Sequence, residues 1–171
     1  MKLKIKEIVV FSMLGALMFA IKLVMEPLPN IHLVGVVITA ITLVYRVKAL
    51  YPIYIFVVLF GLYYGFSVWW IPYIYVWTVL WGMVMVLPKR IPKKVQPFVY
   101  AGICGLHGFL YGTLYAPFQA IAFGYTFKQT LTWISLGIPF DITHGISNFV
   151  CGLLICPLII LLRKLTPKNS I

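Results

Sequence analysis

Polar side chains that interrupt long apolar runs are the first candidates for chemistry in this sequence. Asp141, His144 and Asn148 follow one another at spacings of three and four residues. At about 100° per residue, these spacings place the three side chains on one face of a helix. A carboxylate, an imidazole and an amide that converge can orient the polar edge of a small ligand, or they can satisfy one another in an internal hydrogen-bond network.

Two further polar sets accompany this trio. His107, Tyr111 and Tyr115 recur at spacings of four in the preceding apolar run, so they share one side of a helix. Lys22 and Glu26 are four residues apart at the end of the first apolar run. That pair is equally typical of a lysine that reaches along the helix to water and meets an exposed glutamate. We expect both sets to contribute to a binding site.

Aromatic side chains are concentrated in one later run. Trp70, Tyr73 and Trp77 share an arc of a helix, and Trp133 lies in a more polar segment further on. Trp and Tyr also gather at membrane interfaces and fill protein cores, so both roles are alternatives to ligand contact. Aromatic walls with a few polar groups suit a small, flat, heteroaromatic ligand.

Signatures of catalysis and of metal binding are missing from the sequence. It has no GxxxxGK[ST] phosphate loop, no HExxH zinc motif and no GxSxG elbow. Its only carboxylate side chains are Glu7, Glu26 and Asp141, and its three cysteines form no CxxC pair. We therefore expect no enzyme, no metal site and no cofactor.

The elements that position these residues must be membrane helices. Hydrophobic residues make up 63% of the 171 residues and charged residues only 10%, whereas about a quarter of the residues in soluble domains are charged. One small water-soluble core could not bury so much apolar surface. Lipid is therefore the expected solvent.

The net charge of +11 is distributed in a way that excludes a nucleic-acid partner. Twelve of the fourteen basic residues form four short clusters between the apolar runs, at positions 2–6, 46–48, 89–94 and 163–168. Such clusters mark the cytoplasmic ends and loops of membrane proteins. A nucleic-acid surface would instead need a contiguous basic patch.

Six apolar runs are candidates for membrane helices, each near the roughly 17–25 residues that cross a bilayer. They are Ile8 to Met25, Ile31 to Tyr45, Ala49 to Phe66, Val68 to Leu87, Val95 to Phe118 and Ile142 to Leu162. The sequence thus predicts an all-α integral membrane protein, a single domain over residues 1–171.

The connectors between these runs set the expected orientation. Those after the second and fourth runs are basic, whereas those after the first and third carry no basic residue. Both termini are therefore predicted to be cytoplasmic. The connector 119–141 has one basic residue, Lys128, and is predicted to be the longest irregular stretch, typical of a binding loop.

Small residues at helical spacing predict close helix packing in two places. Ser12, Ala16 and Ala20 form one stripe, which can admit a partner helix or pack within the chain. Gly108 and Gly112 form a second small pair, for which internal packing is favoured.

In this arrangement the chain resembles the substrate-binding S components of energy-coupling-factor vitamin importers. The stripe Ala16-Leu17-Met18-Phe19-Ala20 is similar to the AxxxA motif with which that family docks on a coupling subunit. The segments Leu106-His107-Gly108-Phe109 and Thr143-His144-Gly145-Ile146-Ser147-Asn148 are similar to the thiamine-binding branch. The resemblance implies a six-helix bundle in a bacterial plasma membrane.

The resemblance also implies partners and a mode of action. A membrane coupling subunit and two cytoplasmic ATPases would drive import of a small vitamin-like ligand that this chain binds with high affinity. A stand-alone facilitator or proton-coupled carrier, with His107, His144 and Asp141 as a relay, is the alternative, and a small intramembrane enzyme is a more remote one.

Overall fold

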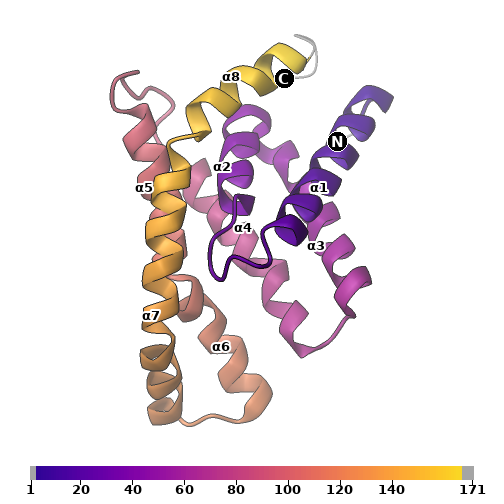
Figure 1. Ribbon diagram of the computed structural model, residues 1–171. Helices are drawn as coiled ribbons and strands as arrows, with labels where there is room; N and C mark the ends of the chain where they lie inside the picture. The colour runs from indigo at the N-terminus through magenta and orange to yellow at the C-terminus, as the bar shows by residue number, and fades with distance from the viewer. Residues whose placement is uncertain (1–2, 167–171) are drawn as a thin grey trace.

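The computed structural model describes residues 3–166, and these residues contain helices and turns but no strand. The basic positions Lys2 and Lys168 lie outside the described residues. The helices and 3-10 turns, in chain order, are α1 (Ile5–Val24), α2 (Val34–Tyr45), η1 (Arg46–Ala49), α3 (Leu50–Tyr64), η2 (Val68–Trp70), α4 (Ile71–Met85), α5 (Gln96–Phe109), α6 (Tyr111–Phe123), α7 (Phe127–Gly152) and α8 (Ile155–Leu165) (Figure 1).

Helix α2 forms the centre of the bundle. All of its 12 residues except Leu43 are buried, as expected of a helix that is hydrophobic around its whole circumference. Its two threonines, Thr39 and Thr42, donate their hydroxyl hydrogen bonds to the carbonyls of Gly35 and Ile38, so no side-chain hydroxyl of this helix is left unpaired. A buried position explains why so short a helix suffices here.

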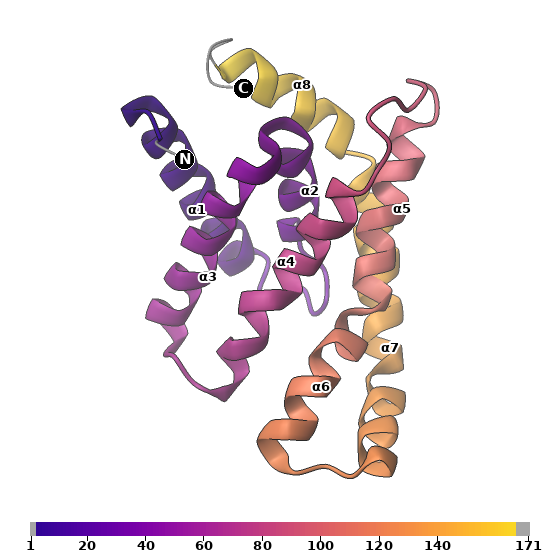
Figure 2. The same cartoon turned by 180° about the vertical axis from the view of Figure 1, so that it is seen from behind.

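The other helices pack in pairs around α2. Helix α1 lies against α3. Both α4 and α8 lie against α2, and α5 lies along α7 (Figures 1 and 2). Helix α2 ends at Tyr45, and the next residue, Arg46, has a φ of 54° and a ψ of −121° that redirect the chain through η1 into α3. Helices α6 and α7 extend together beyond the other helices at the end of the molecule away from the termini (Figure 1).

Three of the sequence-based predictions for the C-terminal half are wrong. The predicted helix from Val95 to Phe118 is two helices, α5 and α6, which meet at Leu110. The predicted irregular stretch 119–141 is helical except for a short turn around Gly124, and its larger part is the first half of the 26-residue helix α7. The predicted helix from Ile142 to Leu162 changes direction by 53° between α7 and α8.

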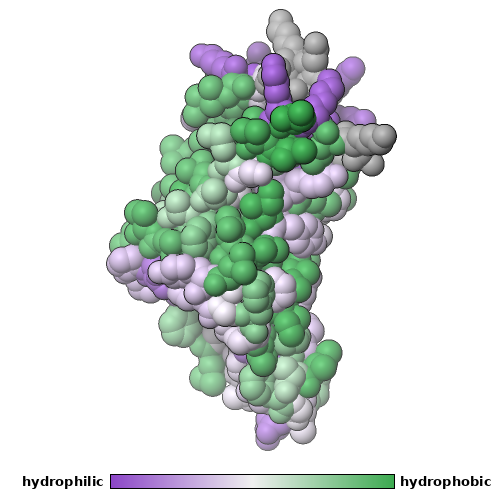
Figure 3. All heavy atoms as spheres, turned by 90° about the vertical axis from the view of Figure 1, so that its right-hand side faces the viewer, coloured by the Kyte–Doolittle hydropathy of each residue, from purple (hydrophilic) through white to green (hydrophobic). Residues whose placement is uncertain are grey.

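Several helices are long and apolar enough to cross a membrane. Three helical segments meet this criterion, Ile5–Val24, Val34–Tyr64 and Val68–Met85, and the bent pair α7 and α8 adds a fourth if it forms one span. The start of α1 and the end of α8 lie at the same end of the molecule (Figure 1). In the face shown by Figure 3, the most hydrophilic residues gather at that end, and an apolar surface covers much of the remainder.

Candidate functional site

A contiguous group of five aromatic rings lies where the first interhelical loop meets α4, α5, α6 and α7. We call it the histidine cluster, and it consists of His32, Trp77, His107, Tyr111 and His144. The ring centroids of His32 and His144 are 4.6 Å apart, and those of His144 and Tyr111 are 4.8 Å apart. Trp77 lies 5.7–6.0 Å from the rings of His107, Tyr111 and His32. The cluster thus joins five separate segments of the chain.

Most of the polar atoms in this region have no hydrogen-bond partner within the protein. These atoms are His32 Nδ1, Trp77 Nε1, His107 Nδ1, His144 Nε2 and both amide atoms of Asn148. Their five side chains are between 0% and 4% exposed. A buried polar group without a partner costs about 1–3 kcal/mol, so native proteins rarely retain several such groups side by side unless a ligand or water satisfies them.

The chemistry of each free atom limits what could pair with it. The Nε2–H of His107 donates to the carbonyl of Val76 at 3.0 Å, since a carbonyl can only accept. A neutral His107 therefore presents an acceptor at Nδ1. The Trp77 indole offers only a donor, while the Asn148 amide offers both a donor and an acceptor. The site can therefore read a ligand edge that itself carries donors and acceptors.

Two local features position the histidines of the cluster. The loop before α2 is tied to α7 because the Ser147 hydroxyl donates to the carbonyl of Asn30 at 3.0 Å. Asn30 has a φ of 60°, a left-handed conformation that asparagine tolerates better than most residues. This turn directs the chain so that His32 meets His144.

Glycines make room for Asn148 between α5 and α7. A Cβ atom at Gly108 would lie 2.9 Å from Asn148 Nδ2 and 2.8 Å from the Cα of Gly145. Only the absence of side chains allows the two helices to approach so closely, which confirms the internal packing expected for Gly108. The amide of Asn148 consequently lies one helical turn from His144, next to the cluster.

Asp141 lies at the junction of α5 and α6, where it has a structural partner. Both of its carboxylate oxygens accept from the backbone N–H of Gly112, at 2.9 and 3.1 Å. Gly112 belongs to the first turn of α6, where backbone N–H groups lack helical partners and a negative charge is favourable. The carboxylate thus caps α6 at the point where α5 ends.

Three other residues that the sequence assigned to the site also have partners elsewhere. The Trp70 indole donates to the carbonyl of Val57, and the Tyr115 hydroxyl donates to the carbonyl of Trp69. Glu26 is exposed and accepts from the Tyr64 hydroxyl at 2.7 Å. These bonds link η2 to α3 and α6, and the end of α3 to the loop that follows α1.

The remaining candidates lie at different distances from the cluster. Tyr73 is buried, and its ring stacks on Phe60 at 5.1 Å and reaches Trp77 at 5.7 Å. Lys22 is half-buried on α1 and lies within electrostatic range of His32 and His144. Trp133 is half-buried on the first half of α7, without a ring contact to any member of the cluster.

Sequence reasoning missed His32. It is the second residue of the predicted membrane run Ile31 to Tyr45, and no polar residue lies three or four positions from it. The signal that was available is an ionisable side chain inside an apolar run. Intramembrane ionisable residues are functional candidates by default.

The small-residue stripe of α1 faces outward. Ser12, Ala16 and Ala20 are exposed, whereas their neighbour Gly15 is buried, and a Cβ at Gly15 would lie 2.5 Å from the side chain of Ile55. Internal packing therefore applies to Gly15 and not to the stripe.

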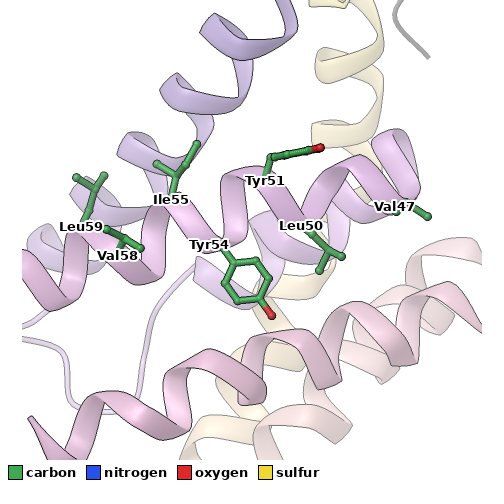
Figure 4. Close-up of a pocket in the computed structure, with 7 residues that line it drawn as sticks. All are labelled: Val47, Leu50, Tyr51, Tyr54, Ile55, Val58 and Leu59. Carbon is green, nitrogen blue, oxygen red and sulfur yellow. The ribbon is translucent and has the colours of Figure 1, made fainter. Parts of the chain in front are cut away.

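An apolar groove runs along α3 and the turn before it (Figure 4). Its volume is about 510 Å³. Ile55 both lines the groove and packs against Gly15 of α1. Through Ile55 the groove reaches α1 at Gly15, the residue next to Ala16 of the stripe. The lining residues are Val47, Leu50, Tyr51, Tyr54, Ile55, Val58 and Leu59.

Neither a metal site in the described part of the chain nor a known relative assigns a role to these residues. Within residues 3–166, no group of three or more His, Cys, Asp or Glu side chains has a geometry that could hold a metal ion. Comparison with known proteins finds no matching family model, no matching curated protein and no matching solved structure. The function must therefore be argued from the geometry alone.

Proposed function

We propose that this chain is the membrane-embedded, high-affinity binding subunit of an ATP-driven importer of the energy-coupling-factor type. Its ligand is a small, vitamin-like heteroaromatic compound, and the chain itself catalyses no reaction. The observation that carries the proposal is the group of six unpartnered polar atoms on His32, Trp77, His107, His144 and Asn148. A ligand that pairs with them removes a desolvation cost that the free protein bears, and this differential stabilisation favours tight binding.

The unpartnered side-chain atoms restrict which hydrogen-bonding groups the ligand can carry along its polar edge. Trp77 needs an acceptor, His107 needs a donor, and Asn148 needs both at adjacent positions. A ring lactam or a ring carboxamide supplies this combination, while the flat rings of Tyr111 and Trp77 favour a stacked aromatic body. The three histidines and Lys22 provide no negative group, so a permanent cation is a poor fit.

The outer surface of α1 and α3 supports the assignment of a membrane partner. Ser12, Ala16 and Ala20 present only small side chains, which let another helix approach closely, and packing is the main force between helices in lipid. The neighbouring groove on α3 enlarges this surface. A membrane coupling subunit would dock there, and two cytoplasmic ATPases would act through it.

A six-span topology with both termini in the cytoplasm belongs to this proposal. The location of both chain ends at the more hydrophilic end of the bundle supports it, as does the positive-inside rule. Cysteine labelling tests it in intact bacterial cells, using variants Lys94→Cys and Lys128→Cys. We expect a membrane-impermeant reagent to label position 128 and to spare position 94 until the cells are opened. Labelling in the reverse order would contradict the topology.

The ligand itself provides the most direct test of the binding function. Small molecules released by heat from the purified full chain are identified by mass spectrometry, and the double variant Trp77→Phe/Asn148→Ala is treated in the same way. We expect a heteroaromatic compound with a lactam or carboxamide edge from the parent protein and a much smaller amount from the variant. Release of the same compounds in equal amounts from both proteins would place binding outside the histidine cluster.

A second experiment tests the coupling to ATP. The tagged chain is purified from its own cells in mild detergent, and its partners are compared between the parent and Ala16→Trp. The parent should bring down a pair of ATPases and a membrane subunit, and the variant should not. Parent protein that carries no ATPase would contradict the importer assignment.

A stand-alone or proton-coupled carrier is the second candidate. The contact of His32 with His144, and the connection of His144 to His107 through Tyr111, favour it, because contiguous imidazoles can relay protons. Asp141 lies outside this path, since its carboxylate is bonded to Gly112. Uptake by the chain alone in proteoliposomes, driven by a pH gradient and without ATPases, would support the carrier and contradict the importer.

A further inference from the structure

A second polar site lies at the opposite end of the bundle, the end at which α1 starts and α8 ends (Figure 1). It is a hollow of about 570 Å³ between the α2–α3 turn, the α4–α5 loop, α5 and α8. Three basic side chains from these distant segments line it, Arg46, Lys89 and Arg163. The hollow does not involve any residue of the histidine cluster, and only its assignment to the cytoplasmic side rests on the proposed topology.

The three cations of this basic pocket have no acidic side chain to pair with. The sequence contains only three acidic residues, and each of them is engaged elsewhere. Glu7 forms an ion pair with Lys48 at 2.5 Å. Glu26 accepts from Tyr64, and Asp141 accepts from Gly112. Like charges gathered in one hollow repel one another, so a negative group from outside the chain would be strongly favoured there.

Arg46 is held in place from both of its ends. Its guanidinium donates to the carbonyl of Met85 at 3.1 Å, and its own carbonyl accepts from the indole of Trp81 at 3.1 Å. Its backbone has a φ of 54°, which is uncommon for a residue with a side chain and is retained where the surroundings require it. The guanidinium carries five N–H donors, so several remain for an anion after the bond to Met85.

The pocket is also apolar on part of its wall. Leu43, Leu87 and Ile159 line it together with the basic residues. A hollow that is cationic in one part and apolar in another matches an amphiphile better than a free ion. Basic pockets between membrane helices on the cytoplasmic side are suited to anionic lipid headgroups.

We propose that this basic pocket binds the phosphodiester group of an anionic phospholipid, with Arg46, Lys89 and Arg163 around the phosphate. A free phosphate ion and a phospholipid headgroup would bind the three cations in the same way. The apolar wall of the pocket favours the phospholipid, because its acyl chains can lie against that wall. Arginine suits such a ligand because its planar donors match phosphate oxygens in pairs. The lipid joins the α2–α3 turn to α8 and so stabilises the cytoplasmic end of the bundle.

Native mass spectrometry of the full chain in detergent tests this proposal. The probes are phosphatidylglycerol and phosphatidylcholine, which share acyl chains and differ in headgroup charge. The variant Lys89→Gln/Arg163→Gln removes two exposed charges from the pocket. The matched control Lys93→Gln/Lys94→Gln removes two charges from the same end of the molecule but outside the pocket lining.

We expect the parent and the control to retain phosphatidylglycerol in preference to phosphatidylcholine. The affinity of the pocket variant for phosphatidylglycerol should fall by at least about tenfold. Equal weakening by both double variants would show diffuse attraction and overturn the proposal, as would equal binding of the two lipids by the parent. In the last measurement, inorganic phosphate at millimolar concentration is added as a competitor for the bound phosphatidylglycerol. Displacement of the lipid by phosphate would overturn the assignment to a lipid.

Discussion

Two stripes of small residues in this chain have similar spacing but opposite surroundings. The α1 stripe, Ser12, Ala16 and Ala20, is exposed along its whole length. The glycine seam, Gly105, Gly108 and Gly112, faces α7 so closely that a Cβ atom at any of the three would meet an atom of α7 at 3.1 Å or less. A stripe of small residues therefore permits a close helix contact, but it does not show whether the other helix belongs to the same chain.

The two stripes differ in how much they contribute to packing within the protein. Along the seam, α5 and α7 make the most extensive contact between any two helices, and backbone lies against backbone. On α1, Phe11, Leu14, Gly15 and Met18 are buried, whereas the stripe residues Ser12, Ala16 and Ala20 remain exposed. Because packing drives association in lipid, the exposed stripe is where we propose that a second protein docks.

The largest expected effect is at the centre of the seam. Gly108→Leu would place a Cβ 2.8 Å from Gly145 Cα and from the His144 carbonyl oxygen. Overpacking costs about 1–3 kcal/mol even where side chains can adjust, and here backbone atoms would have to move. We expect no monodisperse protein on size-exclusion chromatography.

The control for this substitution lies on the same helix. Gly102 has no atom within 4 Å of its virtual Cβ, so Gly102→Leu adds the same side chain without a collision. It should yield folded protein in the normal amount. A folded Gly108→Leu variant with unchanged ligand binding would show that the seam is not needed for the fold.

The next effect distinguishes the two faces of α1. Ala16→Trp should leave the isolated chain folded and able to bind its ligand, because Ala16 is exposed. Transport by the assembled complex should fall to background, since the indole would block a partner helix. Uptake of radiolabelled ligand in cells measures the second property, and fluorescence titration measures the first.

Gly15→Trp is the internal counterpart of that variant. It should impair folding itself, because Ile55 and the Pro52 carbonyl occupy the space. If Ala16→Trp loses ligand binding in proportion to transport, the α1 stripe belongs to the interior of the functional protein and the docking assignment is wrong.

A smaller effect is expected beside the seam, at the histidine cluster. A hydrogen bond contributes about 0.5–1.5 kcal/mol, and 1.4 kcal/mol corresponds to tenfold in affinity. Asn148→Ala and His144→Ala should therefore each weaken ligand binding by about tenfold, as measured by calorimetry. Ser135→Ala, an exposed position on the same helix, is the control. Parental affinity in both variants would place the ligand elsewhere.

The smallest effect is expected at the end of the seam. Asp141→Asn keeps an oxygen that can accept from Gly112 but removes the negative charge at the start of α6. The loss should be about 1 kcal/mol, the difference between a charged and a neutral acceptor. Thermal unfolding in detergent would register it as a modest decrease in Tm, with ligand affinity retained. A tenfold loss of affinity without a change in Tm would instead make Asp141 a ligand contact.

Much of the general architecture could be predicted from the sequence. The helical class followed from composition, and four of the six apolar runs correspond closely to α1, α2, α3 and α4. Helical spacing placed His107 and Tyr111 on one side of a helix, and we expected both to share a site with His144 and Trp77. The four rings lie together in the histidine cluster. The function of that cluster stays a prediction.

The errors share one physical origin. Helix periodicity persists across a break such as Leu110, so it cannot show that α5 and α6 are separate helices. The segment 119–141 interleaves polar and apolar residues between two apolar runs, which suggested a loop, but the Thr126 and Gln129 capping box starts α7 within it. Tertiary contacts with α6 then favour helix over loop.

Composition and charge placement are enough to predict a bundle of apolar helices with its basic residues grouped between them, because both act through solvation. The tertiary structure was needed to show which small-residue stripe is internal, that Asp141 caps α6, that His32 contacts His144, and that Arg46 and Arg163 line one hollow. Those outcomes depend on which helices become neighbours. Neighbours in space are set by packing among segments far apart in the chain, which no local pattern encodes.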